Sequence, residues 1–461
     1  MLAEAMGLGV TSLGTADAPH DPAQAPSRRA RARAKRSAPV GLTVLGLWLL
    51  SFNDARVGGQ KVSDWCFVLA AGAVIANLLS GRTQKLAPVA MRRTPPLVLL
   101  GSLVLMTAGA LSSLFAVDPI TSMLEVARYG SVTLLWFWLL RAVTQNRETL
   151  WRLVRAFKAT VLLSCFGAAL GLFGVLQMNG DPSAPNANRQ SAWFNHPNLL
   201  AFLLATGLPL FFLDVPRVTS TSEVQRLVRR WVPTAIVTFF LASTGSITGM
   251  MAAGAGLVVM AVAGELSSGR ARRGAQTKPG ALFAGFIIVP IAVVALLQSG
   301  APVVERFDSF RGGNASIEYS VESRDKFNEY AVDQIGDRLL VGIGLDLASH
   351  KVFPPPSSAA AAHNMYLTVL VDLGLPGLVG LVIILWWALK TGWQLVRKTQ
   401  DPELYPLALA LLASTVTAII TAYFHPTQHF RVYWFPVAMI SVLWGLRRQE
   451  LADAAAEPRA V

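Results

Sequence analysis

Charged side chains are scarce in this chain of 461 residues. They make up 15% of it, whereas 53% of the residues are hydrophobic, and a soluble globular protein is about one-quarter charged. Cysteine is nearly absent: Cys66 and Cys165 both lie inside apolar runs, so we expect no disulfide framework. The sequence also lacks a D-x-D acidic pair and a glycine-rich phosphate loop. These absences exclude an ordinary soluble protein and leave a polytopic membrane protein.

Apolar runs long enough to cross a bilayer recur along the whole chain. With a span of roughly 20 apolar residues as the template, the sequence predicts an all-α fold, a polytopic membrane helix bundle of about 12 transmembrane helices. The seventh and eighth spans are short, with a tight turn at Ser243–Ser246 between them, so one kinked pair is an alternative. The expected spans are 39–53, 62–80, 96–116, 121–142, 152–176, 198–215, 231–243, 247–263, 281–299, 364–388, 404–423 and 431–446.

The chain divides into five expected parts. Residues 1–38 form a basic cytoplasmic tail, which has no cleavable signal peptide pattern and which we expect to be disordered. Residues 39–299 carry transmembrane helices 1–9, and 300–363 form one large outward-facing loop. Residues 364–446 carry helices 10–12, and 447–461 form a second cytoplasmic tail.

The net charge of +13 reflects where the basic residues lie. Lysine and arginine concentrate in alternate loops and in the N-terminal segment, and this pattern holds through every expected crossing. The positive-inside rule therefore puts both termini in the cytoplasm. The excess charge matches anionic membrane lipid and gives no reason to expect nucleic acid as a partner.

Histidine is also unevenly placed. Only His20 lies in the N-terminal tail, and the other five lie on the outward side: His196, His350, His363, His425 and His429. An intramembrane or interfacial ionisable group is by default a candidate functional site. We therefore expect any active site on the outer face. For His363, which stands where a membrane helix begins, the alternative is an interfacial residue that caps that helix.

Arginines on the outward side are candidates for binding an anion. The stretch Ser323–Leu340 is predicted to be an amphipathic helix, in which Arg324 and Arg338 fall on the apolar stripe. Such a guanidinium needs an anionic partner or must reach back to water. We favour ligand binding for Arg324 and lipid phosphate for Arg338. Arg189 precedes the helix start at Pro197, where an anion is favoured, although an interfacial anchor is equally compatible.

Two further groups of polar residues were weighed. Glu125 and Arg128 stand at i,i+3 within the fourth span and are expected to pair as a structural feature. His425 and His429 at i,i+4 precede Arg431, but Pro426 argues against a regular helix there and no third ligand is close in sequence. We therefore predict no metal site.

The outward-facing motifs, in this order, resemble the membrane family of O-antigen ligases and O-antigen polymerases. The most specific motif is Ala362-His363-Asn364-Met365-Tyr366-Leu367 followed by Asp372-Leu373-Gly374. The stretches that carry the resemblance are 189–198, 323–344 and 362–377. The family's serine-arginine-glycine after the seventh span is here Ser246-Ile247-Thr248-Gly249, which removes one expected arginine.

The resemblance implies a bacterial inner-membrane glycosyltransferase with a periplasmic active site in the large loop. Its donor is a glycan on undecaprenyl diphosphate, and a ligase transfers it to the lipid A–core oligosaccharide without a cofactor. His363 and Arg324 are then the expected catalytic residues. Further donor-binding residues are expected from Arg189, Arg338, Asn364 and Tyr366, with His196, His425, His429 and Arg431 as additional candidates.

Two alternatives stay open. An O-antigen polymerase uses a second lipid-linked glycan as acceptor, and the single large loop favours the ligase over it. A secondary transporter places its polar residues at mid-membrane, whereas here they lie at the outer surface, apart from Glu125 and Arg128.

Overall fold

The computed structural model describes residues 37–52, 56–57, 60–83, 86–88, 92–116, 118–172, 191–194, 196–213, 223–266, 328–329, 332, 335–344, 364–427 and 429–456. The expected ninth span, the expected N-terminal tail and most of the large loop lie outside these residues.

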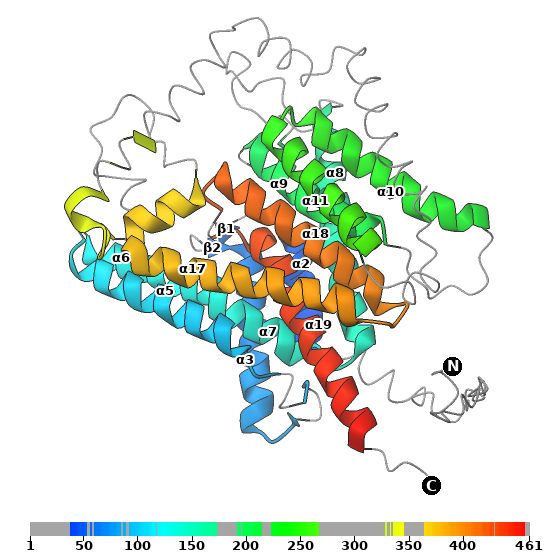
Figure 1. The fold of residues 1–461 in the computed structure, drawn as a ribbon, viewed down its shortest axis with the longest axis horizontal. Coiled ribbons are helices and arrows are strands. Elements are labelled where there is room, and N and C mark those ends of the chain that lie inside the picture. Colours follow the sequence, from blue (N-terminus) through cyan, green and yellow to red (C-terminus); the bar gives the residue numbers. More distant parts are fainter. Residues whose placement is uncertain are drawn as a thin grey trace, which may run out of the picture. The chain divides into compact units, whose positions relative to one another are not determined.

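The described chain is almost entirely helical (Figure 1). Its other regular structure is one antiparallel pair of two-residue strands, β1 (Arg56–Val57) and β2 (Gln60–Lys61). The α-helices are α2 (Ala38–Leu49), α3 (Val62–Leu79), α5 (Pro96–Leu114), α6 (Pro119–Gly130), α7 (Trp136–Val143), α8 (Arg147–Leu172), α9 (Pro197–Phe211), α10 (Glu223–Ser243), α11 (Ile247–Leu266), α17 (Met365–Lys398), α18 (Leu404–Tyr423) and α19 (Arg431–Ala456). A π-helical segment, η3 (Ser131–Leu135), joins α6 to α7, and η4 (Gly336–Arg338) is a 3₁₀ turn.

Six of these helices are long and apolar enough to cross a membrane: α3, α5, α8, α11, α17 and α18. The predicted multi-pass membrane protein is thus supported, while the number of 12 spans stays a prediction. Several helices run past the expected spans, and α19 continues to Ala456 although its apolar run ends at residue 446. Hydropathy marks only the apolar part of a helix, and charged residues can extend the same helix into water.

The seventh and eighth spans form two separate helices, α10 and α11. The predicted turn between them is confirmed: Gly245 has φ +62° and its N–H donates to the carbonyl of Ala242. Ser246 accepts a hydrogen bond from the N–H of Gly249 and so helps to start α11.

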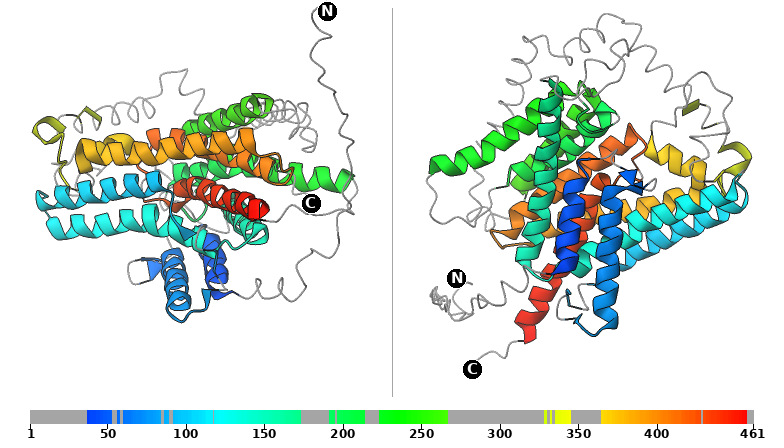
Figure 2. Two further views of the ribbon diagram at one scale, coloured as in Figure 1. Left: turned by 60° about the horizontal axis from the view of Figure 1, so that its bottom comes forward. Right: turned by 180° about the vertical axis from the view of Figure 1, so that it is seen from behind.

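The longest packed pair is α5 with α17, which lie side by side in both figures (Figures 1 and 2). Their close approach depends on Gly101 and Gly380, because a Cβ at either one would meet the other's carbonyl oxygen at 2.6–2.7 Å. Small residues at helix contacts are typical of membrane bundles, where dispersion between closely packed backbones replaces hydrophobic burial.

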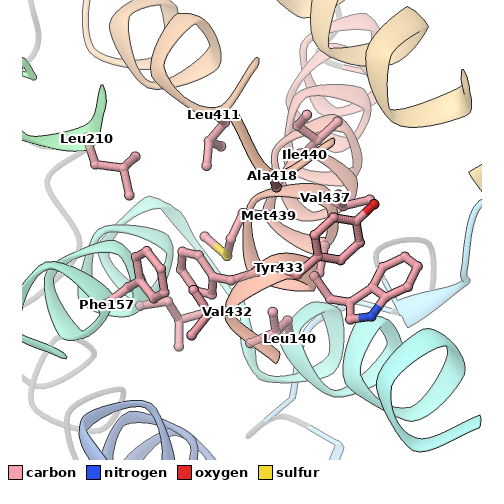
Figure 3. Packing of buried hydrophobic residues seen from close by; sticks show 14 of the residues in the cluster. Leu140, Phe157, Leu210, Leu411, Ala418, Val432, Tyr433, Val437, Met439 and Ile440 are labelled. Carbon is pink, nitrogen blue, oxygen red and sulfur yellow. The ribbon is translucent and has the colours of Figure 1, made fainter. Parts of the chain in front are cut away.

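The core of the described bundle surrounds α19 and α18, which are buried on most of their faces. Aromatic side chains of α19 pack against α7 and α8, and the ring of Phe435 stacks on Phe157 with centroids 4.0 Å apart. Figure 3 shows Val432 of α19 near Phe157 of α8 and Leu140 of α7. Because α19 packs against several helices, the position of its first residue is well defined, and so is the end of the turn that precedes it.

Candidate active site

The expected site residues divide into two groups. His363, Arg324 and Arg189 lie outside the described residues. Described are Arg338, Asn364, Tyr366, His196, His425, His429 and Arg431.

The first turn of α17 is held by the residues of the most specific motif. Asn364 has extended backbone angles, and its Oδ1 accepts the N–H groups of Tyr366 at 2.9 Å and Leu367 at 3.2 Å. It is therefore the N-cap of α17. The hydroxyl of Tyr366 donates to the carbonyl of Ile419 at 2.8 Å and lies beside the phenol of Tyr433. The asparagine oxygen expected to bind substrate is thus engaged in capping.

The turn between α18 and α19, residues 424–430, gathers several other expected residues. The ring of His425 stacks near His196, with centroids 6.0 Å apart and 28° between the planes. The hydroxyl of Thr427 contacts Sδ of Met365 at 3.5 Å. Two starts of helices, α9 and α17, therefore meet at this turn.

His196 begins α9, as the Pro197–Asn198 pair predicted. Its Nδ1 accepts the N–H of Asn198 at 3.1 Å, and Pro197 occupies the first helical position. A neutral imidazole in this arrangement carries its proton on Nε2. His196 is thus an N-cap as well as a neighbour of His425.

His429 faces a different helix from His425. Its ring packs edge-on against Tyr129 of α6 at 4.7 Å, and its Nε2 lies 3.8 Å from Oε2 of Glu125. The same carboxylate forms the expected ion pair with Arg128. Within the described ranges no three His, Cys, Asp or Glu side chains are grouped as in a metal site.

Arg431 links helices. Its guanidinium pairs with the carboxylate of Asp64 in α3, lies 5.2 Å from the ring of Phe67 and approaches Oγ of Ser131 at 3.5 Å. Only 11% of its side chain is exposed. Arg431 therefore links α19 to α3 through an ion pair. Asp64 escaped the sequence reasoning because a single acid before an apolar run has no distinctive pattern.

Arg338 lies against a different helix end. Its exposed guanidinium donates to the carbonyl of Phe115, the C-cap residue of α5, at 3.4 Å. The helix α17 is interrupted at Gly374, whose φ is +67°. Residues 338–344 pack against this break: the N–H of Ile343 donates to the carbonyl of Val371, and the N–H of Leu375 donates to the carbonyl of Leu339. The expected binding residues therefore approach α17 at two places, its N-terminus and its break.

The sequence reasoning also missed Arg141. Arg141 stands at the end of the expected span 121–142 and has the pattern of a basic loop residue, but it lies in α7 and is fully buried, with Nη1 donating to the carbonyl of Ser441. Its guanidinium lies over the ring of Trp444, 5.7 Å from the centroid. A Cβ at residue 445 would lie 2.8 Å from the guanidinium nitrogens of Arg141, so a glycine is needed at Gly445 to accommodate the buried side chain. A basic residue just after an apolar run is indistinguishable from a loop residue by composition.

Comparison with known proteins gives one family. Residues 232–382 match the family model described as O-antigen ligase. No curated protein gives a match to the chain. The matched region runs from α10 through α11 to the first half of α17. It includes Arg324, Arg338, His363, Asn364 and Tyr366, whereas Arg189 and the 424–430 turn lie outside it.

Proposed function

We propose that this chain, whose residues 232–382 match the O-antigen ligase family model, transfers O-antigen glycan from undecaprenyl diphosphate to the lipid A–core oligosaccharide. The observation that carries the proposal is the end of the matched region. There the motif residues Asn364 and Tyr366 start α17 and anchor it to α18, beside the 424–430 turn. His363 directly precedes this cap in sequence.

The proposed topology has 12 spans, both termini in the cytoplasm and residues 300–363 in the periplasm of a bacterial inner membrane. Loop contacts support it, because helix ends of the same predicted side meet one another. Contacts on the outer side join His425 to His196, Thr427 to Met365 and Arg431 to Asp64. On the inner side, Arg147 meets Asp401 and Glu450.

In the proposed mechanism, guanidinium groups hold the donor diphosphate. Arg189 and Arg324 bind its oxygens and stabilise the charge that develops on the leaving diphosphate. His363 removes the proton from the acceptor hydroxyl as a general base. Attack of that hydroxyl on the anomeric carbon expels the diphosphate and inverts the centre. No metal takes part in these steps.

The contacts of the other candidate residues suggest supporting roles in the proposed reaction. Asn364 and Tyr366 set the position of the α17 start, which directly follows His363 in the sequence. Arg338, whose guanidinium lies at the end of α5, is assigned to the donor diphosphate. The 424–430 turn contains His425 and His429, and His196 and Arg431 lie next to it. We assign the three histidines to binding of the acceptor and Arg431 to a structural role.

A reconstituted transfer reaction tests the proposal. Purified full-length protein is mixed with undecaprenyl-diphosphate glycan and a lipid A–core acceptor, with and without a chelator. The expected result is glycan on the core in both conditions. Glycan joined instead to a second lipid-linked glycan identifies a polymerase. Transfer that stops with the chelator contradicts the metal-free mechanism.

A deletion strain gives an independent readout. Loss of a ligase leaves bare core and accumulated lipid-linked polymer. Loss of a polymerase leaves core that carries a single repeat, and that profile would overturn the ligase assignment.

A further inference from the structure

An apolar groove opens on the outer half of the α5–α17 pair. Its volume is about 300 Å³, at the lower end of the range for ligand sites. The groove is lined by one face of α5, by Pro376 of α17, and by Leu340 and Val341, which cover it as a roof. The α5 residues recur at helical spacing: Leu103, Val104, Thr107, Ala108 and Leu111.

The groove faces the surroundings of the bundle. Leu103 is 49% exposed and Leu111 is 52% exposed, although both lie in a helix apolar enough to cross a membrane. Such side chains contact hydrocarbon, so a lipid chain reaches the groove laterally without passing through water.

A rigid clasp, residues 338–344, forms the roof. Gly342 and Gly374 both have positive φ, +79° and +67°. A Cβ on Gly342 would meet the carbonyl oxygen of Asp372 at 2.3 Å, and one on Gly374 would meet the backbone of Leu340 at 2.8 Å. Only glycine allows this approach, and the backbone bonds from Gly344 to Asp372 and from Leu375 to Leu339 then fix the roof.

The same clasp carries a cation at the groove's outer mouth. Arg338 stands two residues before Leu340, and its guanidinium lies at the carbonyl of Phe115, one residue past the end of α5. An apolar groove with an exposed guanidinium at the nearby end of α5 complements a hydrocarbon chain with an anionic head, because arginine forks match phosphate oxygens.

We propose that this groove, with its mouth at Arg338, seats the first isoprene units of a polyprenyl diphosphate. This inference rests on the proposed function, which makes that lipid the donor. The isoprenoid chain then lies beneath Leu340 and Val341, and the diphosphate lies near Arg338. In the sequence, the matched region runs on from residue 344 through His363. An acyl chain of a bulk phospholipid is the competing occupant.

Binding of undecaprenyl diphosphate without a glycan tests the groove separately from transfer. Full-length protein carries a photoreactive benzoylphenylalanine at Thr107 in the groove or at Leu100 outside it, in nanodiscs of phosphatidylethanolamine and phosphatidylglycerol. We expect the lipid to be captured at Thr107 and not at Leu100, as read by mass spectrometry. Equal capture at both positions, or capture at Thr107 that excess phosphatidylglycerol abolishes, overturns the proposal.

A matched pair of variants measures the affinity. Leu103 and Leu100 lie on the same helix and are each 49% exposed, but only Leu103 lines the groove. Leu103→Trp should weaken binding about tenfold by filling the space of several methylene groups, while Leu100→Trp should leave it unchanged. Arg338→Gln should weaken binding of the diphosphate more than that of undecaprenol. Unchanged binding by Leu103→Trp contradicts the groove assignment.

The two proposals fail in different ways. If the lipid binds the groove but no glycan reaches the core acceptor, the ligase function is wrong and the groove stands. If transfer proceeds normally in Leu103→Trp with unaltered donor affinity, the groove is wrong and the ligase function stands.

Discussion

The hydroxyl of Tyr366 donates a hydrogen bond of 2.8 Å to the backbone carbonyl of Ile419. It joins the first turn of α17 to the outer part of α18, across 53 positions of the chain. Asn364 caps the same turn, so both described motif residues hold the start of α17. The motif thus has a structural part, Asn364 and Tyr366, in addition to its expected catalytic histidine.

Tyr366→Phe should lower stability by about 1 kcal/mol, because it removes one largely buried hydrogen bond. Thermal unfolding of the purified protein in detergent measures this loss. Tyr423→Phe is the control, since Tyr423 is 59% exposed, and it should have little effect. Equal shifts in the two variants would show that the bond to Ile419 contributes nothing.

His363→Ala should reduce transfer by roughly 10²–10⁴-fold, the usual contribution of a general base, and leave donor binding nearly intact. Arg324→Ala should instead weaken binding of the donor diphosphate. Steady-state kinetics and a separate binding assay distinguish the two effects. Wild-type transfer by His363→Ala refutes the base, and unchanged donor affinity in Arg324→Ala refutes the phosphate contact.

Gly374→Ala should cost about 1–3 kcal/mol, because Gly374 has φ +67° and ψ −173°, a region essentially restricted to glycine. The added Cβ would also displace the clasp at Leu340. Gly254→Ala is a matched control inside α11, where a Cβ meets nothing within 4 Å. That change should stabilise the helix by up to about 1 kcal/mol. Thermal unfolding that shifts downward in both variants contradicts the special role of Gly374.

Arg431→Ala and Asp64→Ala should each destabilise the protein by about 2–3 kcal/mol, since each leaves a mostly buried partner charge uncompensated. Transfer should fall only as far as the folded fraction falls. Arg397→Ala is the comparison, because Arg397 is exposed in the last turn of α17, and it should cost about 0–1 kcal/mol. If Arg431→Ala loses transfer while it stays fully folded, Arg431 has a direct role in the reaction.

Asp401 lies between α17 and α18 and should make stability depend on pH. Partial burial is the largest influence and raises its pKa, but the N–H groups of Glu403 and Leu404 and the guanidinium of Arg147 together lower it below the ordinary value. Because the folded state has the lower pKa, this contribution is complete above about pH 4 and is lost as the pH falls through the lowered value.

Asp401→Asn keeps an oxygen for the helix cap and removes the charge. The variant should melt below the wild type at pH 7, and the gap should narrow as the pH approaches about 3. A gap that stays constant over this range means that the charge of Asp401 does not stabilise the fold.

Much of the fold was predictable from the sequence. Hydropathy located α5, α11, α17 and α18, because a helix in lipid satisfies its own backbone and only needs an apolar surface. Pro197 and the Ser243–Ser246 turn were read correctly from local backbone chemistry. The helix ends were less accurate, since charged extensions such as 447–456 carry no apolar signal.

The sequence by itself determined the helical membrane character and the resemblance to the O-antigen ligase family, both of which depend on local composition and order; the outward placement of the candidate residues stays a prediction from the charge pattern. Only the tertiary structure decided what each described candidate touches. It separated His425, beside His196, from His429, beside Glu125, although four positions separate them in the chain. It paired Arg431 with Asp64 and placed Arg338 at the end of α5. Contacts between residues hundreds of positions apart depend on how helices pack, and no local pattern encodes that packing.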